Sequence, residues 1–129
     1  MHIIFGGAFN GKRAHVEKLL IEQDIQVVQW LDAAAEAPVL LPTTEAIVLS
    51  GVETVTESTL TRWIDQLESW GETVQVYVIA TEIGRGIVPM SASLRILRDD
   101  VGRFYQQIFA KAEQVTRIWY GIPQTIKGR

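Results

Sequence analysis

Residues 3–13 read Ile-Ile-Phe-Gly-Gly-Ala-Phe-Asn-Gly-Lys-Arg, an apolar run followed by a glycine-rich loop that ends in two basic residues. In the phosphate-binding pattern G-x-x-x-x-G-K-[ST], the glycines let backbone N–H groups converge on a phosphate and the lysine reaches its oxygens. Gly6, Gly11 and Lys12 match this pattern, whereas Arg13 replaces the hydroxyl that ordinarily holds Mg²⁺. The loop is therefore predicted to bind a nucleotide, ATP or GTP, through Gly6, Gly7, Ala8, Phe9, Asn10, Gly11, Lys12 and Arg13.

The sequence around the loop favours this interpretation over a glycine-rich turn that binds nothing. A strand-like run precedes the loop, and from Lys12 apolar residues recur at helical spacing through Leu19 and Leu20, ending near Asp24. A helix that begins at Lys12 directs its N-terminal N–H groups and the positive end of its dipole at the loop.

Strand-like segments alternate with helical patterns along the rest of the chain. Such alternation predicts a mostly parallel sheet with helices on its faces. Strands are expected at residues 2–5, 25–31, 46–50, 74–80 and 115–121, and a short edge strand at 125–127 follows a turn at 121–123. Helices are expected from 12 to about 24, from 60 to 70 with Gly71 at the C-cap, and from about 91 to 114.

Composition bounds the class of protein. The 129 residues, 47% of them hydrophobic, fit a single domain over 1–129. No apolar run approaches the roughly 20 residues of a membrane span, and no secretory leader is expected. Without cysteine, and with only His2 and His15, no metal site is predicted, and a net charge of −3 argues against nucleic-acid binding. A cytoplasmic protein is expected.

A second glycine motif, Thr81-Glu82-Ile83-Gly84-Arg85-Gly86-Ile87-Val88-Pro89, follows an expected strand and precedes the longest helix. Its glycines allow a backbone to approach a ligand closely, although a tight structural turn is the alternative. Ligands of open parallel sheets bind beyond the carboxyl ends of the strands. Five segments are expected to converge there: residues 6–12, Asp32, residues 50–51, residues 81–89 and the turn after Gly121.

Residues 81–106 resemble the signature of the adenosylcobinamide kinase/adenosylcobinamide-phosphate guanylyltransferase family of cobalamin biosynthesis. That signature reads Asn-Glu-Val-Gly-x-Gly-Ile-Val-Pro and then Arg-x-x-Arg-Asp-x-x-Gly-x-x-Asn-Gln, with Thr81 and Tyr105 here in place of its two asparagines. Residues 6–12 are also similar to the family's opening loop, and 118–123 to its final strand and turn. The matching residues are Glu82, Gly84, Gly86, Ile87, Val88, Pro89, Arg95, Arg98, Asp99, Gly102 and Gln106.

The resemblance implies a P-loop (RecA-like) three-layer α/β domain that works as a kinase. It implies catalytic roles for Lys12, on the phosphates, and for Glu82. It places Gly84, Gly86 and Pro89 at the substrate, which would be a corrinoid. Family members form trimers through helix packing, so a homo-oligomer is implied as well.

Three departures from the family point to lost chemistry. The interval from Leu31 to Thr44 is short and holds no histidine, so the residue that accepts GMP in the family is missing. Ser50 stands where the family ends its third strand in Asp, and Arg13 stands in place of the loop hydroxyl. Both usual supports for Mg²⁺ are therefore replaced, and only Glu53, Asp32 or Glu82 would remain to hold the metal.

Three hypotheses follow: a divergent active kinase without guanylyltransferase activity, a non-catalytic relative that binds a nucleotide, a corrinoid or a partner subunit, and a plain α/β domain with structural glycines. Individual residues have simpler interpretations too. Lys12 would otherwise be a solvated lysine, Glu82 a turn cap, and the charges at 95–99 a surface set. Trp63 and Trp70 are expected in the core or at an interface.

Overall fold

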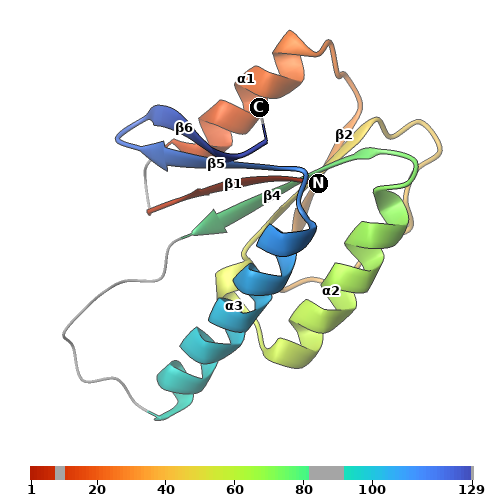
Figure 1. Ribbon diagram of the computed structural model, residues 1–129. Coiled ribbons are helices and arrows are strands. Elements are labelled where there is room, and N and C mark those ends of the chain that lie inside the picture. Colours follow the sequence, from red (N-terminus) through yellow and green to blue (C-terminus); the bar gives the residue numbers. More distant parts are fainter. Residues whose placement is uncertain (8–10, 82–91, 129) are drawn as a thin grey trace.

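The computed structural model describes residues 1–7, 11–81 and 92–128, which form a sheet with helices on both faces (Figure 1). This architecture confirms the predicted α/β class with a mostly parallel sheet. The elements are β1 (His2–Gly6), α1 (Lys12–Glu22), β2 (Val28–Asp32), β3 (Ala46–Ser50), the short 3₁₀ helix η1 (Val52–Thr54), α2 (Glu57–Trp70), β4 (Gln75–Thr81), α3 (Ala92–Lys111), β5 (Gln114–Trp119) and β6 (Ile122–Lys127).

The sheet has the strand order β2-β3-β4-β1-β5-β6. All neighbouring strands are parallel except β5 and β6, which form an antiparallel hairpin. The first strand of the chain therefore lies inside the sheet, between β4 and β5. Because the strands from β1 to β5 run in one direction, their carboxyl ends meet at a single edge.

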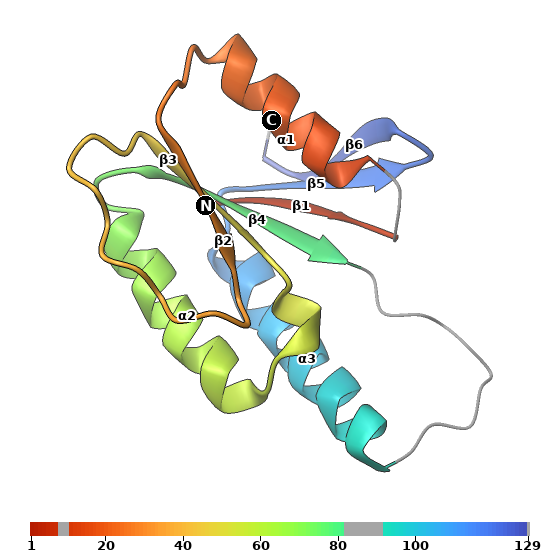
Figure 2. The ribbon, with the colours of Figure 1, turned by 180° about the vertical axis from the view of Figure 1, so that it is seen from behind.

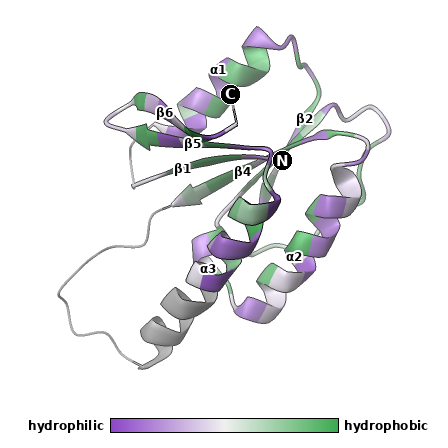
Figure 3. Ribbon diagram, in the orientation of Figure 1, coloured by the Kyte–Doolittle hydropathy of each residue, from purple (hydrophilic) through white to green (hydrophobic). Residues whose placement is uncertain are grey.

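Hydrophobic side chains fill both faces of the sheet, and the strands carry most of the strongly apolar residues (Figure 3). Helix α1 covers one face, and α2 and α3 cover the other (Figures 1 and 2). Within the described ranges, no helix combines the length and apolar content that a membrane crossing requires. Fully buried residues include Ile4, Val16 and Val48 on the α1 face, and Ile3, Leu49, Leu60, Val78 and Ile108 on the other.

Helix α2 buries the apolar face that its sequence pattern predicts. The apolar residues predicted at helical spacing, from Leu60 to Trp70, are buried against the sheet. Gly71 is the C-cap as expected, and its N–H donates to the Leu67 carbonyl at 2.9 Å. Its φ of −62° is right-handed, so this cap does not use the left-handed conformation that glycine favours.

Strand β2 begins at Val28 and not at the predicted residue 25. The chain leaves α1 through Asp24, which has a φ of +55°, and the Ile25 N–H donates to the Leu20 carbonyl at 2.9 Å. Residues 24–25 therefore complete the end of the helix. Ile25 still packs on the α1 face, and its apolar side chain therefore matches the pattern expected of a buried strand.

The last helix and the last strand also differ from the prediction. Helix α3 ends at Lys111, before the predicted residue 114, because the Glu113 N–H already donates to the Met1 carbonyl at 3.0 Å beside β1. The turn consists of Tyr120 and Gly121, which have φ values of +49° and +76°. Positive φ at both central residues is typical of a two-residue hairpin turn. Strand β6 consequently begins at Ile122, inside the region predicted as a turn.

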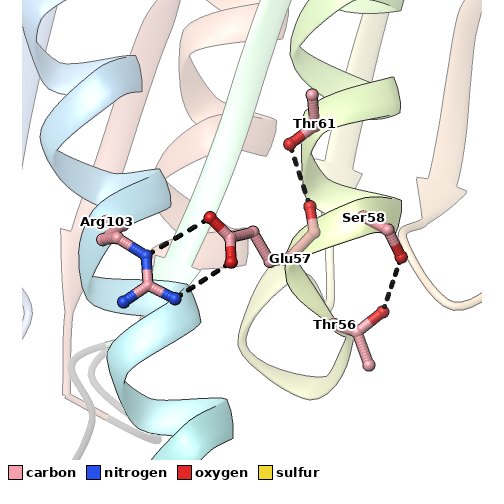
Figure 4. A network of polar contacts seen from close by, with 5 residues as sticks. All are labelled: Thr56, Glu57, Ser58, Thr61 and Arg103. Carbon is pink, nitrogen blue, oxygen red and sulfur yellow. Dashed lines mark hydrogen bonds and ion pairs between the residues drawn. The ribbon is translucent and has the colours of Figure 1, made fainter.

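A bidentate ion pair joins α2 to α3 (Figure 4). Arg103 donates from Nε to Glu57 Oε1 at 3.3 Å and from Nη2 to Glu57 Oε2 at 3.0 Å. Both side chains are half exposed, so the pair contributes about 1 kcal/mol or less. The pair links α3 to the first turn of α2, beside the apolar contacts that pack the two helices together. Around it, Thr61 donates to the Glu57 carbonyl and the hydroxyls of Thr56 and Ser58 lie 3.3 Å apart.

Candidate functional site

The candidate site lies at the carboxyl edge of the parallel strands. Gly6, the last residue of β1, is level with Thr81 of β4 on one side and with Ile118 of β5 on the other. A Cβ atom on Gly6 would lie 2.6 Å from the Ile118 carbonyl oxygen, so the close approach of β5 requires a glycine here. Gly11 has a φ of +79° and is the N-cap of α1, which begins at Lys12 as predicted.

Lys12 is buried, with 7% of its surface exposed, although it is the first residue of a helix. Its Nζ donates to the Gly7 carbonyl, so the lysine reaches back toward the loop. Burial lowers the pKa of Lys12, and the negative charge of Glu53 opposes that change. A solvated lysine, the simpler interpretation, does not describe this side chain.

Glu53 supplies the acidic side of this edge. It lies in η1, directly after β3, and Gly51 begins this turn with a φ of +77°. The Oε2 atom of Glu53 is buried and has no hydrogen-bond partner among the described residues. A buried carboxylate oxygen without a partner is costly and calls for an explanation. Lys12 and Glu53 therefore bring opposite charges to the same edge of the sheet.

Tyr105 of α3 lies at the same edge, on the face of the sheet that α2 and α3 cover. Its hydroxyl donates to the Thr81 carbonyl at 2.6 Å, at the end of β4. Burial, followed by the negative charge of Glu53, raises the pKa of Tyr105 above its usual range. The phenol therefore stays protonated and acts as a fixed donor that ties α3 to β4.

The side chain of Arg13 packs against β2, whereas that of Lys12 reaches back to the loop. Its guanidinium carbon is 4.2 Å from the centre of the Trp30 ring of β2, and its Nε donates to Glu17 at 3.1 Å. The side chain is 68% exposed and packs over an aromatic ring, which is a favourable place for a guanidinium. A phosphate contact by Arg13 stays a prediction, and it would require the side chain to leave Trp30.

The two other strand ends hold polar groups with local partners. Ser50 Oγ donates to the Leu31 carbonyl at 3.4 Å, and Asp32 Oδ1 accepts the Ala34 N–H at 2.9 Å. Within the described ranges, no group of three or more His, Cys, Asp and Glu side chains is placed to bind a metal ion.

Several predicted site residues lie outside the described residues: Ala8, Phe9 and Asn10 of the first loop, and Glu82, Gly84, Gly86 and Pro89 of the second. Their roles stay predictions. Among the described residues, the role of Tyr105 was not predicted, because in the sequence Tyr105 stands only as a departure from the family pattern. Glu53 was named as one of three acids that could hold Mg²⁺, with Asp32 and Glu82, and was not set apart from them. The sequence feature that could have singled out Glu53 is its position, three residues beyond a buried strand and close to a glycine turn.

The comparisons with known proteins place the chain in a family. The family model described as cobinamide kinase / cobinamide phosphate guanyltransferase matches residues 20–126. The chain belongs to this cobinamide kinase family. The match runs from the end of α1 to β6, and therefore includes Glu53, Tyr105 and the second glycine motif. It begins beyond Lys12, so the first loop is not part of the family match. A search of curated proteins found no match.

Proposed function

We propose that this cobinamide kinase family member binds ATP or GTP at the loop from Gly6 to Arg13. The buried Lys12, donating to the Gly7 carbonyl at the start of α1, is the observation that carries the proposal. A P-loop domain of RecA-like type is supported by the first strand lying between β4 and β5 with a glycine loop and a helix behind it. The phosphates of the nucleotide would replace the Gly7 carbonyl as the partner of Lys12.

The reaction that we infer is phosphoryl transfer to an alcohol of a corrinoid. The hydroxyl oxygen attacks the γ-phosphorus, the bond from that phosphorus to the β–γ bridging oxygen breaks, and the nucleoside diphosphate leaves. The hydroxyl proton passes to Glu82, to which the family resemblance gives a catalytic role, and Gly84, Gly86 and Pro89 contact the substrate. Lys12 stabilises the charge on the phosphate oxygens. Guanylyl transfer is lost because residues 31–44 hold no histidine.

Phosphoryl transfer of this kind ordinarily uses Mg²⁺, which neutralises phosphate charge. Among the described residues near the loop, one side chain is suited to bind this ion. Arg13 packs on Trp30, and Ser50 donates its hydroxyl to a backbone carbonyl. Among the acidic side chains that the structure describes, Glu53 is the one with a buried carboxylate oxygen that lacks a partner. Glu53 would therefore hold Mg²⁺ here.

Calorimetric titration with ATP and GTP, with and without Mg²⁺, tests the proposal. Lys12→Ala should weaken nucleotide binding roughly 10- to 100-fold, because a charged hydrogen bond contributes about 1.5–3 kcal/mol. Lys18→Ala is the matched control, since Lys18 is an exposed lysine of the same helix. If neither nucleotide binds the unaltered protein, or if Lys12→Ala binds as tightly as the parent, nucleotide binding at this loop is rejected.

The role of Glu53 has its own readout. Glu53→Gln keeps the size of the side chain and should abolish any gain in nucleotide affinity that Mg²⁺ gives. A gain that survives in this variant would show that another residue holds the ion. Glu57→Gln, which alters an exposed acid of α2, serves as the control.

A non-catalytic nucleotide-binding relative is the second candidate, and the packing of Arg13 on Trp30 favours it. Its signature is nucleotide binding that Mg²⁺ does not change, together with no turnover of cobinamide. The double variant Arg13→Ser with Ser50→Asp restores both family metal supports. Turnover that appears only in this variant would establish that the parent binds without catalysis.

A further inference from the structure

The β5–β6 hairpin ends in two exposed aromatic residues. Trp119 is 50% exposed and Tyr120 is 79% exposed, and their ring centres lie 5.1 Å apart in an edge-to-face arrangement. Arg117 lies on the same strand, with its guanidinium carbon 4.9 Å from the centre of the Trp119 ring. The core does not account for these rings, because Trp119 is half exposed and Tyr120 is mostly exposed.

The conformation of Tyr120 strengthens this point. Its φ of +49° is left-handed, a region in which a side chain with a Cβ atom is disfavoured. Two-residue turns of this kind favour Asn, Asp or Gly at that position. The chain therefore holds a large exposed aromatic residue where a smaller polar residue would stabilise the turn better. Such an exception is more common at functional sites than elsewhere.

The register places this aromatic pair just beyond the level of Gly6, at the edge of the sheet where the first loop begins. Ile118 is level with Gly6, and Trp119 and Tyr120 follow it at the carboxyl edge of the sheet. In both views the β5–β6 turn and the start of α1 lie on the same side of the molecule (Figures 1 and 2). A nucleotide whose phosphates contact Lys12 would thus have the aromatic pair at the same edge of the sheet.

We propose that Trp119 and Tyr120 form a stacking surface for the base of the bound nucleotide. This inference rests on the proposed nucleotide binding at the first loop. Flat aromatic rings stack on any nucleobase, and a neighbouring guanidinium strengthens such contacts. The surface therefore recognises a base without selecting strongly between adenine and guanine. It adds to affinity independently of the contacts that the loop makes with the phosphates.

The test compares ATP and GTP with inorganic tripolyphosphate, which has the phosphates but no base. Tyr120→Asn removes the ring and suits the turn, so this variant should melt at the same temperature as the parent or higher. Trp119→Leu removes the other ring. Each variant should weaken ATP and GTP binding roughly 5- to 100-fold, the range measured for stacking on one aromatic residue, and leave tripolyphosphate binding unchanged. Ile126→Ala, at an exposed residue of β6, should change neither.

Either of two binding results would overturn the inference while leaving nucleotide binding intact: ATP binding equal to the parent in both aromatic variants, or an equal loss in Ile126→Ala. A lower oligomeric mass in the aromatic variants would also overturn it, because the pair would then be a subunit contact. Failure of the parent to bind tripolyphosphate and both nucleotides would instead reject the proposed function itself.

Discussion

At the scale of single residues, Trp63 shows that one side chain can join two segments that the sequence keeps apart. The indole is buried with 4% exposed, and its Nε1 donates to the Ala33 carbonyl at 2.9 Å, just beyond β2. Trp63→Phe keeps the apolar ring and leaves that carbonyl without its donor, which should cost about 1–3 kcal/mol. Trp63→Ala should cost about 3–5 kcal/mol, because it also opens a cavity.

Urea unfolding of both variants, followed by circular dichroism, measures these losses. The order is the informative part: the phenylalanine variant should fall between the parent and the alanine variant. If Trp63→Phe unfolds at the same urea concentration as the parent, the hydrogen bond contributes nothing to stability.

His2 should make the stability of the protein depend on pH. Burial, with smaller effects from His15 and the N-terminal amine, lowers the pKa of His2 from 6.5 to about 4. The unfolded chain therefore binds a proton near pH 6.5, whereas the folded chain does so only near pH 4. The stability that neutral His2 provides is fully present above pH 6.5 and is lost as the pH falls toward 4.

His2→Gln tests this effect, because glutamine can still bond to Thr116, whose hydroxyl lies 2.9 Å from His2 Nε2. The free energy of unfolding of this variant should change less than that of the parent between pH 6.5 and pH 4. Burial and Lys18 lower the pKa of His15 too, so His15→Gln is measured beside it. An unchanged slope in His2→Gln would assign the pH dependence to other groups.

At the scale of elements, the last strand also caps the longest helix. Lys127 of β6 donates from Nζ to the carbonyls of Phe109 and Ala110, at 3.0 and 3.1 Å, near the end of α3. A positive charge there complements the helix dipole. Lys127→Met should therefore destabilise the fold by about 0.5–1 kcal/mol, a modest value because the site is exposed.

Salt provides the check on this contact, since an electrostatic loss shrinks at high ionic strength. The difference between Lys127→Met and the parent should be smaller in 1 M salt than in dilute buffer. Lys18→Met changes a lysine whose pairing with Glu22 is long, at 3.9 Å, and should have almost no effect. An equal loss for both variants would show that the contacts with α3 have no special role.

The elements differ in how far the sequence determines them. The stripe from Leu60 to Trp70 predicts α2 because a helix with one buried face repeats every 3.6 residues, and β3 was predicted with the bounds that it has. The start of β2 was not predictable from periodicity, because Ile25 is apolar and yet belongs to the turn that ends α1. Likewise, a turn was predicted at 121–123, but its first central residue is Tyr120, where Asn, Asp or Gly is usual, so the start of the turn one residue earlier was not predictable from local residue types.

At the scale of the whole molecule, the candidate site depends on contacts that sequence spacing does not show. Lys12 was predictable from a motif, since its neighbours along the chain define it. Glu53 and Tyr105 come from different elements, and only the order of the strands brings them to the same edge as Lys12. The position of Arg13 was not predictable for the same reason, because Trp30 lies on a distant strand.

One sheet with an apolar core on each face should unfold as a unit, as the predicted single domain over residues 1–129 requires. Strand β1 contributes Ile3 to one core and Ile4 to the other, so neither core survives the loss of that strand. Tryptophan fluorescence, which includes Trp63 and Trp70 on the α2 face, should change at the same urea concentration as circular dichroism, which reports all helices. Hydrogen exchange should then show amides of α1 and α2 opening with the same free energy in their most protected positions. Two separate transitions, with α1 lost before α2, would mean that the two faces fold independently and that the chain is not one cooperative domain.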